Sequence, residues 1–373
     1  MSVTDAGQRP AGTDGLPSPS GSPCWADDDR AVLVCRRVLE ITHDVKSFHF
    51  EAKSPGAFLF EPGQFITLDV EVEGESIARC YTISSPPTRP NLISITVKRV
   101  VGGPVSNWLH DTVVPGTEVV AAAPLGAFTI AGSRARKLLF LSAGSGITPL
   151  MSMTRTLFDL ASDTDVLFVH SARTPADIIF RRELDAMASV MPTIRVHHIC
   201  EGDYPSERWN GLRGRLSRSM LEAVAPDLAE RDTYVCGPAA YMTSVRRTLE
   251  DLGYDMGRYH EESFSFEQLG PAEVPPAAEA AVLPPTASFT VEFVRSGVTV
   301  QCAPDQTVLD AAYAAGLRLP ASCTQGMCGT CKTTKISGDV DLRHNGGIRP
   351  REIADGKVLP CVSWPLSDLQ IDS

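Results

Sequence analysis

Four cysteines near the C-terminal end of the chain have a spacing that restricts what this region can fold into. Three follow the pattern C-x4-C-x2-C and a fourth comes much later; they are Cys323, Cys328, Cys331 and Cys361. This spacing is typical of a loop that holds a [2Fe–2S] cluster. Three thiolates can point inward from one short loop only if its backbone bends sharply, which Gly326 and Gly329 permit. The sequence therefore predicts an electron-carrying iron–sulfur site closed by a distant fourth ligand.

A structural zinc site is the alternative for these cysteines. Zinc sites usually pair two C-x2-C knuckles, whereas Cys361 stands alone in residues 359–362. Upstream, residues 307–316 have apolar side chains at three- and four-residue spacing before a glycine, which predicts a helix. With these features, residues 287–373 resemble a plant-type ferredoxin domain. The resemblance implies an α+β, β-grasp-like fold.

Length and composition indicate a multidomain globular protein. At 373 residues the chain exceeds a single hydrophobic core, and its 43% apolar content can fill several. A net charge of −11 argues against a nucleic-acid partner, since no basic patch would neutralise phosphates. Residues 1–23 carry no apolar segment, and no run elsewhere approaches the ~20 apolar residues of a membrane helix. We therefore expect a cytoplasmic protein that does not enter a membrane.

Several other residues with reactive side chains are expected to be structural. His197 and His198 lie on a predicted strand and face opposite sides, so they cannot easily share a metal. Asp177 and Glu183 are expected to be helix-cap and surface charges. The cysteines expected to be small hydrophobic residues are Cys24, Cys35, Cys80, Cys200 and Cys302.

The pattern of predicted elements divides the chain into five segments. Residues 1–30 are rich in Gly, Pro, Ser and Asp, which predicts a disordered tail. Residues 31–132 show short alternating segments between Gly and Pro turns, which predicts an antiparallel β-barrel. Residues 133–266 alternate strands with helices, which predicts an α/β domain with a parallel sheet. Residues 267–286 are rich in Pro and Ala and are expected to link this domain to residues 287–373.

Two segments of the predicted barrel suggest a ligand-binding surface. We place Arg79, Tyr81 and Thr82 at alternating positions of one strand, so that all three side chains project from one face. A guanidinium suits a pyrophosphate, an aromatic ring can stack on an isoalloxazine, and a hydroxyl can bond to a flavin nitrogen. In residues 97–109 a glycine pair precedes a helical turn whose backbone N–H groups can bind an anion. An ordinary barrel strand with an exposed arginine is the alternative.

Together the two segments resemble the flavin domain of the ferredoxin-NAD(P) reductase family, in which R-x-Y-[ST] and G-x-x-S motifs bind FAD. Residues 62–65, Pro-Gly-Gln-Phe, also match the barrel of that family. The resemblance implies an FAD-binding barrel. The residues it implicates in binding FAD are Arg79, Tyr81, Thr82, Val97, Lys98, Gly103, Val105 and Ser106.

A second predicted site lies where the buried strand of residues 138–143 runs into a glycine turn and a helix with a proline in its first turn. Such a helix start can bind a pyrophosphate. The same family has a G-x-G-x-T-P motif, then an H-S-A-R-like strand end, then C-G-P, and the chain carries all three in this order. Alone, each could be a polar strand end or a buried thiol. The residues that the resemblance implicates in binding NAD(P)H are Gly144, Gly146, Thr148, Pro149, Ser171, Arg173, Cys236, Gly237 and Pro238.

The resemblance also implies which residues meet at the reaction. In the family the cysteine before Gly-Pro lies beside the nicotinamide, so the resemblance places Cys236, with Tyr81 and Thr82, at the point of hydride transfer. Residues 261–264 resemble the family's acidic and aromatic segment near the flavin. An acid at the end of the second strand would bind the ribose 2′-hydroxyl, whereas an arginine could pair with a 2′-phosphate. Arg173 is present there and no acid follows Val169. Family members fused to a ferredoxin domain more often use NADH, so we expect NADH, with NADPH as the alternative.

Over residues 31–373 the resemblance implies an oxidoreductase that passes electrons from NAD(P)H through FAD and a [2Fe–2S] cluster to a protein acceptor. Nicotinamide delivers two electrons at once and the cluster accepts one, so the flavin is needed between them. Two subgroups are similar: reductases of Rieske oxygenases that demethylate quaternary amines such as glycine betaine or carnitine, which we favour, and reductases of hybrid-cluster proteins. The alternatives are a zinc-holding adaptor that senses a nucleotide and a diaphorase that reduces only small acceptors.

Overall fold

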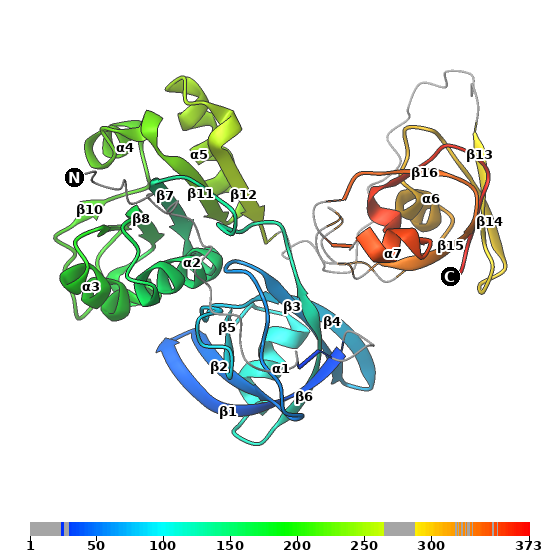
Figure 1. The fold of residues 1–373 in the computed structure, drawn as a ribbon, viewed down its shortest axis with the longest axis horizontal. Coiled ribbons are helices and arrows are strands. Elements are labelled where there is room, and N and C mark those ends of the chain that lie inside the picture. The colour runs from blue at the N-terminus through cyan, green and yellow to red at the C-terminus, as the bar shows by residue number, and fades with distance from the viewer. Residues whose placement is uncertain are drawn as a thin grey trace, which may run out of the picture. The chain divides into compact units, whose positions relative to one another are not determined.

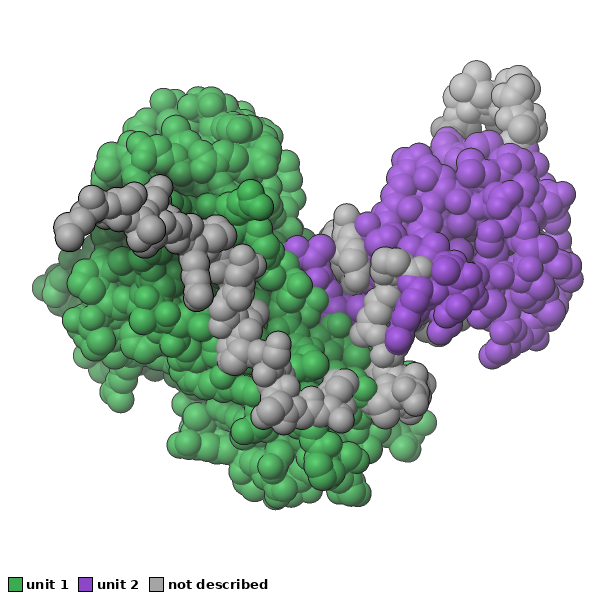
Figure 2. Space-filling view, in the orientation of Figure 1, with its two compact units in different colours: residues 1–77, 81–124, 128–264 green, residues 78–80, 125–127, 265–373 purple. Residues whose placement is uncertain are grey.

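The computed structural model describes residues 24–25, 30–264 and 288–373. Within the last range, positions 318, 320, 322, 323, 325, 327, 328, 330, 345, 346 and 349 are not described. The predicted linker, most of the predicted tail and two predicted cluster ligands, Cys323 and Cys328, therefore lie outside the described residues. The chain forms two compact units, shown in green and purple in Figure 2: residues 1–77, 81–124 and 128–264, and residues 78–80, 125–127 and 265–373. Each is described by itself.

Residues 30–125, most of which belong to the green unit of Figure 2, form the predicted antiparallel barrel, which we call the barrel lobe (β1 to β6 in Figure 1). Its strands lie in the order β4-β3-β6-β1-β2-β5, and β1 pairs antiparallel with both β2 and β6. The elements are β1 (Arg30–Thr42), β2 (Val45–Ala52), β3 (Phe65–Val72), β4 (Glu75–Thr82), β5 (Ile93–Lys98), α1 (Pro104–Thr112) and β6 (Glu118–Leu125). The alternating segments of the sequence bury Phe48, Phe50 and Ile66 in its core.

Two residues from the range predicted as a tail belong to this core. Cys24 and Trp25 are buried, and the Trp25 ring lies 5.9 Å from that of Phe58. The backbone N–H of Cys24 donates to the carbonyl of Ala57. The expectation of a disordered tail is therefore wrong at these two positions, which are packed into the core.

The second half of the green unit is the predicted α/β domain, which we call the α/β lobe (Figure 1). Its strands are parallel in the order β10-β9-β8-β7-β11-β12. They are β7 (Lys137–Ala143), β8 (Asp165–Ala172), β9 (Ile194–Cys200), β10 (Leu212–Arg213), β11 (Asp232–Gly237) and β12 (Tyr259–Ser263). Helices cover both faces, so the central strands are apolar along their length. The helices are α2 (Ile147–Asp159) and α3 (Arg181–Val190), whose apolar residues pack on one face, and α4 (Arg218–Val224) and α5 (Ala239–Asp251), which pack on the other.

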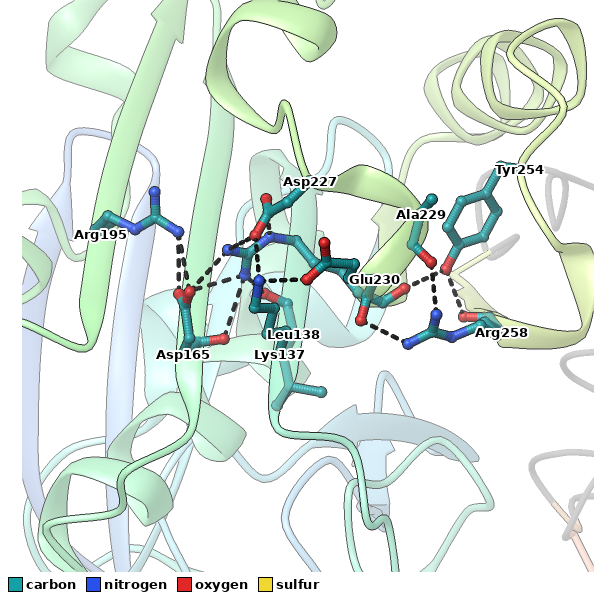
Figure 3. Close-up of polar contacts among 10 residues, drawn as sticks. Lys137, Leu138, Asp165, Arg195, Asp227, Ala229, Glu230, Tyr254 and Arg258 are labelled. Carbon is teal, nitrogen blue, oxygen red and sulfur yellow. Dashed lines mark hydrogen bonds and ion pairs between the residues drawn. The ribbon is translucent and has the colours of Figure 1, made fainter.

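A buried arginine connects the strands at the amino-terminal edge of this sheet (Figure 3). The Arg231 guanidinium is fully buried and donates to Asp227 at 2.8 and 2.9 Å, to the Asp165 carboxylate at 2.9 Å and to the carbonyl of Leu138 at 3.0 Å. Its hydrogen bonds join the first residues of β7 and β8 to the segment before β11. This network therefore holds the sheet together at the end away from the loops that follow β7 and β11.

The purple unit of Figure 2, drawn in yellow to red in Figure 1, contains a small mixed sheet around α6. Its strand order is β14-β13-β19-β15-β17, with a separate β16-β18 pair, and β13 is antiparallel to β14 but parallel to β19. The predicted helix is present: Thr307 caps α6, and Gly316 ends it with a φ of +80°. The elements are β13 (Phe289–Phe293), β14 (Val298–Cys302), α6 (Val308–Ala314), β15 (Thr333–Ser337), β16 (Val340–Leu342), α7 (Pro350–Ala354), β17 (Lys357–Val358), β18 (Ser363–Pro365) and β19 (Leu369–Ile371).

The fold class predicted from the sequence is thus confirmed: an antiparallel barrel, a parallel α/β domain and an α+β domain. In the described part of the chain, no helix has the length and apolar character needed to span a bilayer.

Candidate functional site

The predicted flavin motif lies on β4, but its side chains do not all share one face. Successive strand residues point to opposite sides. Arg79 and Tyr81 are two apart and partly exposed, whereas Thr82 follows Tyr81 directly and is buried. The expectation of a single face is therefore wrong for Thr82, which points to the opposite side of β4 from Arg79 and Tyr81.

The second flavin segment forms the end of β5 and the start of α1. Val97 and Val105 are buried, and Lys98 lies 3.4 Å from the Asp44 carboxylate. The Ser106 hydroxyl accepts from the N–H of Val100 at 3.2 Å and donates to the carbonyl of Gly103 at 3.1 Å. The serine therefore closes the glycine loop that precedes the helix, which fixes the backbone of the predicted anion site.

The nicotinamide loop and the C-G-P motif come together at the carboxyl ends of β7 and β11. Gly144 has a φ of +53°, and residues Gly144–Gly146 form one turn of 3-10 helix before α2. A β-carbon on Gly146 would lie 2.4 Å from the carbonyl carbon and oxygen of Cys236, so only glycine fits there. Thr148 and Pro149 lie in the buried first turn of α2, and Pro238 precedes α5. Ligands of parallel α/β sheets bind at this edge.

Polar side chains occupy one register position across four parallel strands beside this loop. His170, Ser142, Cys236 and Glu262 are paired in that order on β8, β7, β11 and β12. The Ser142 hydroxyl lies 2.8 Å from Nδ1 of His170, and burial lowers the pKa of His170 to about 3. His170 is therefore neutral, and the row carries no fixed positive charge.

Glu262 at the end of this row was not singled out as a site residue by the sequence. It is 4% exposed, and its Oε2 has no hydrogen-bond partner among the described residues. Burial raises its pKa to about 8. Burial, and next the charge of Glu262, raises the pKa of Cys236 well above its ordinary value. A neutral carboxyl and a neutral thiol thus lie side by side at the strand ends. The C-G-P motif had singled out Cys236, whereas only the resemblance of residues 261–264 to the family's acidic segment pointed to Glu262.

The strand end predicted to bind the nucleotide ribose has its arginine in ion pairs. Ser171 lies on β8, and its hydroxyl is buried beside that of Tyr241. Nη2 of Arg173 lies 3.6 Å from Asp177 and 3.8 Å from Asp44 of the barrel lobe. Arg173 is therefore shared between two carboxylates.

In the purple unit, two of the predicted cluster ligands converge. The Sγ atoms of Cys331 and Cys361 lie 3.2 Å apart and both side chains are buried. Two thiolates on one tetrahedral metal, at metal–sulfur bonds of about 2.3 Å, lie about 3.7 Å apart. The two sulfur atoms could therefore bind one metal if they moved slightly farther apart.

The glycines of the cluster loop behave as the sequence predicts. Gly326 and Gly329 both have a φ of +70°. A β-carbon would meet Val362 at 2.6 Å from Gly326, and the carbonyl of Gly347 at 2.6 Å from Gly329. The sharply bent loop therefore requires glycine at both positions. Cys323 and Cys328 lie outside the described residues, so the four-cysteine set stays a prediction.

The residues expected to be structural are placed largely as predicted. His197 and His198 lie on β9, and Asp177 caps the turn at Thr174, whose N–H donates to its carboxylate at 3.0 Å. Glu183 lies in the first turn of α3 but is more than a surface charge, because it pairs with the buried Arg155. The other cysteines expected to be hydrophobic are buried, except Cys80, which is half-buried.

Sequence families match each of the three folded parts. Residues 33–130 match the oxidoreductase FAD-binding domain, residues 140–247 the oxidoreductase NAD-binding domain, and residues 291–366 the 2Fe-2S iron-sulfur cluster binding domain. The fold and these matches define an NAD(P)H-dependent flavoprotein oxidoreductase with an iron–sulfur domain, whose cofactors are FAD, NAD(H) and a [2Fe–2S] cluster. A zinc-holding adaptor does not agree with them.

Relatives match along nearly the whole chain. The glycine betaine monooxygenase reductase subunit of Pseudomonas aeruginosa is 46% identical over 363 residues, which cover 95% of this chain and 98% of the relative. The stachydrine N-demethylase reductase subunit of Rhizobium meliloti is 41% identical, over 94% and 98%. The solved structure of phthalate dioxygenase reductase, with 26% identity and a TM-score of 0.57, covers 93% of this chain and 99% of its own. This chain belongs to the ferredoxin-NAD(P) reductase family, as a reductase that carries a C-terminal [2Fe–2S] domain.

Proposed function

We propose that this reductase delivers electrons to the oxygenase component of a Rieske-type monooxygenase that demethylates a quaternary amine. The observation that carries the proposal is the 46% identity, over 95% of the chain, to a glycine betaine monooxygenase reductase subunit. A second quaternary-amine relative, the stachydrine N-demethylase reductase subunit, supports the same substrate class at 41%.

In this proposal the barrel lobe binds FAD. The guanidinium of Arg79 pairs with the pyrophosphate, Tyr81 meets the ring system from the same side of β4, and the loop closed by Ser106 adds backbone donors. The positions proposed to line the rest of the site are Val97, Lys98, Gly103 and Val105. When bound, the flavin couples two-electron chemistry to one-electron chemistry.

The carboxyl edge of the α/β sheet is proposed to bind NADH. The loop from Gly144 to Pro149 would hold the pyrophosphate, and Ser171 and Arg173 lie where the adenosine ribose is expected. Cys236, with Gly237 and Pro238, would lie against the nicotinamide ring. Gly146 supports this arrangement, because it brings the loop and Cys236 into direct backbone contact. Transfer of hydride depends mainly on such positioning.

Cys323, Cys328, Cys331 and Cys361 are proposed to hold the cluster. The Sγ separation of 3.2 Å between Cys331 and Cys361 supports this assignment for two of the four. We also propose that the protein works in the cytoplasm, where thiolate ligands stay reduced.

Reconstitution tests the acceptor. The purified reductase, an oxygenase that demethylates a quaternary amine, NADH and glycine betaine or stachydrine are combined, and formaldehyde release is measured. We expect demethylation that requires every component, and none when a hybrid-cluster protein replaces the oxygenase. Fast reduction of the hybrid-cluster protein with no reduction of the oxygenase would contradict the proposal, and reduction of ferricyanide alone would indicate a diaphorase.

A further inference from the structure

One face of α2 joins the two lobes of the green unit. Thr148, Ser152, Arg155 and Asp159 recur at steps of four, three and four residues, so they share one side of the helix. Ser152 donates its hydroxyl proton to the carbonyl of Ser85 at 2.7 Å, and Nη1 of Arg155 donates to the carbonyl of Ser84 at 2.5 Å. The face that carries Thr148 in the nicotinamide loop is thus bonded to the barrel lobe.

A third contact extends this face to the end of the helix. The Asp159 carboxylate accepts from Nε of Arg89 at 2.9 Å and from Nη2 at 2.6 Å. This pair is more exposed than the other two contacts, so it contributes less. Ser152 and Arg155 therefore carry most of the connection.

On the barrel side, the two serines belong to the frame of the flavin segments. Ser84 and Ser85 lie two and three residues after Thr82, the last residue of β4, the strand that also carries Tyr81. The N–H of Ser84 donates to the carbonyl of Ser94 at 2.7 Å, and the N–H of Ser94 donates to the Ser85 hydroxyl at 2.9 Å. Both bonds fix the segment to β5, so a shift of α2 would move the ends of both strands.

Arg155 is itself held rigidly. It is 9% exposed, and its Nε and Nη2 donate to the Glu183 carboxylate at 2.8 and 2.7 Å. Its guanidinium lies 4.5 Å from the centre of the Phe180 ring. A buried charge with this many partners keeps one orientation, because any other leaves it unpaired.

We propose that α2 is a rigid spacer between the flavin strand and the nicotinamide loop, and that Arg155 is the positioning residue that sets the distance. At 1.5 Å per residue, Arg155 lies about 10 Å along the axis from Thr148. A helix packed on both sides does not stretch, so fixing its middle to Ser84 fixes its first turn relative to β4. The inference rests on the proposed binding sites for FAD and NADH.

The test compares Arg155→Met with Arg181→Met in the full-length, FAD-loaded protein. Arg181 is a matched control, because it also makes an ion pair, with Glu207 at 2.8 Å, and a ring contact, with Trp209, but neither involves the barrel lobe. Two quantities are measured: deuterium exchange of the amides of Ser84 and Ser94, and the rate of flavin reduction at saturating NADH.

For Arg155→Met we expect exchange at both amides to rise at least about tenfold and flavin reduction to slow about 10- to 100-fold, as misplacement by about 1 Å does. FAD content and the Kd for NADH should change less than about twofold, and Arg181→Met should leave both quantities unchanged. Full-rate reduction in folded Arg155→Met, or equal slowing in Arg181→Met, would overturn the proposal.

Should Arg155→Met fail to fold, Ser152→Ala removes only the bond to Ser85 and should raise the exchange of Ser94 and slow reduction about threefold or more. No change in either quantity would again overturn the proposal. If NADH does not reduce the flavin of the unmodified protein, the proposed function fails, whereas the exchange measurement still decides whether α2 holds the barrel lobe in place.

Discussion

Gly146 and Cys236 touch through their backbones, since a β-carbon on Gly146 would lie 2.4 Å from the carbonyl carbon and oxygen of Cys236 and 2.5 Å from the nitrogen of Gly237. The two residues belong to motifs about ninety positions apart, and their contact places the G-x-G-x-T-P loop against C-G-P. Backbone atoms cannot move aside as a flexible side chain can. The contact therefore excludes any residue larger than glycine at position 146 of the predicted nicotinamide site.

Substitution Gly146→Ala should therefore displace the loop. We expect kcat/KM for NADH to fall at least about tenfold, because the reacting groups are misaligned, while FAD content is retained. Gly202→Ala is the matched control, since a β-carbon there would meet nothing within 4 Å. Steady-state kinetics with NADH and ferricyanide measure the effect. Equal kinetics in the two variants would show that the loop does not bind the coenzyme.

Glu262 should make the stability of the protein depend on pH. Burial raises its pKa in the folded protein to about 8, so between the ordinary glutamate value and about pH 8 the unfolded chain ionises while the folded protein keeps its proton. The free energy of unfolding then falls as pH rises through this window, by about 5 kcal/mol at most. The thermal unfolding midpoint of Glu262→Gln should therefore rise relative to that of the unmodified protein as the pH increases from 5 to 8. Glu261→Gln, at a partly exposed carboxylate that pairs with Arg246, should show no such gain.

Cys361→Ser should remove the cluster and leave the flavin in place. We expect iron to fall from about two atoms per chain to almost none, and electron delivery to a protein acceptor to be lost, while NADH–ferricyanide activity persists. Cys302→Ser, at another buried cysteine of the purple unit, should keep its iron. Iron analysis and the two activities distinguish the variants, and a full iron content in Cys361→Ser would remove this residue from the ligand set.

Arg231→Met should destabilise the α/β lobe without changing the site, because its network lies at the opposite edge of the sheet (Figure 3). Loss of the guanidinium leaves Asp165 and Asp227 facing each other, which we expect to cost about 3–5 kcal/mol of unfolding free energy. Arg195→Met removes only an exposed partner of Asp165 and should cost less than about 1 kcal/mol. Thermal unfolding compares the two.

The same network should weaken in acid. Hydrogen bonds from Arg231 hold the pKa of Asp227 well below its ordinary value, so its contribution is complete above about pH 4 and is lost as pH falls further. The difference in unfolding midpoint between the unmodified protein and Arg231→Met should therefore shrink below pH 4. A constant difference down to pH 2 would contradict the assignment.

The ion pairs of Arg173 should favour NADH over NADPH. A 2′-phosphate would have to displace Asp44 and Asp177 from the guanidinium and would then lie beside both carboxylates. Asp44→Asn should raise the NADPH-to-NADH ratio of kcat/KM about 3- to 10-fold at low ionic strength. Asp111→Asn, which removes an exposed partner of Arg99, should not. An unchanged ratio in Asp44→Asn would show that Asp44 does not influence the choice between NADH and NADPH.

Much of the fold follows from local patterns. Alternation along β2, β3 and β5, the apolar run of β7 and the capped helix α6 are properties of neighbouring residues, and the structure contains each of these elements. The bends at Gly326 and Gly329 were predictable as well, because the spacing of three inward thiolates requires them.

What the sequence did not reveal depends on contacts between distant segments. Strand β12 was not predicted, because its residues are mostly polar and its order comes from pairing with β11. Glu262 is buried by that pairing, and Arg155 by packing between lobes, although both residue types are usually exposed. Thr82 was placed on the wrong face because Tyr81 is its direct neighbour in a strand, where sides alternate.

The most direct test of the electron path is rapid freezing of the anaerobic protein at intervals after mixing with NADH, followed by electron paramagnetic resonance. We expect the flavin absorption to bleach and the signal of a reduced two-iron centre to grow, and Cys361→Ser to bleach without that signal. Bleaching of the flavin with no such signal in the unmodified protein, at any time before turnover ends, would contradict a path from NADH through the flavin to the cysteine-bound cluster.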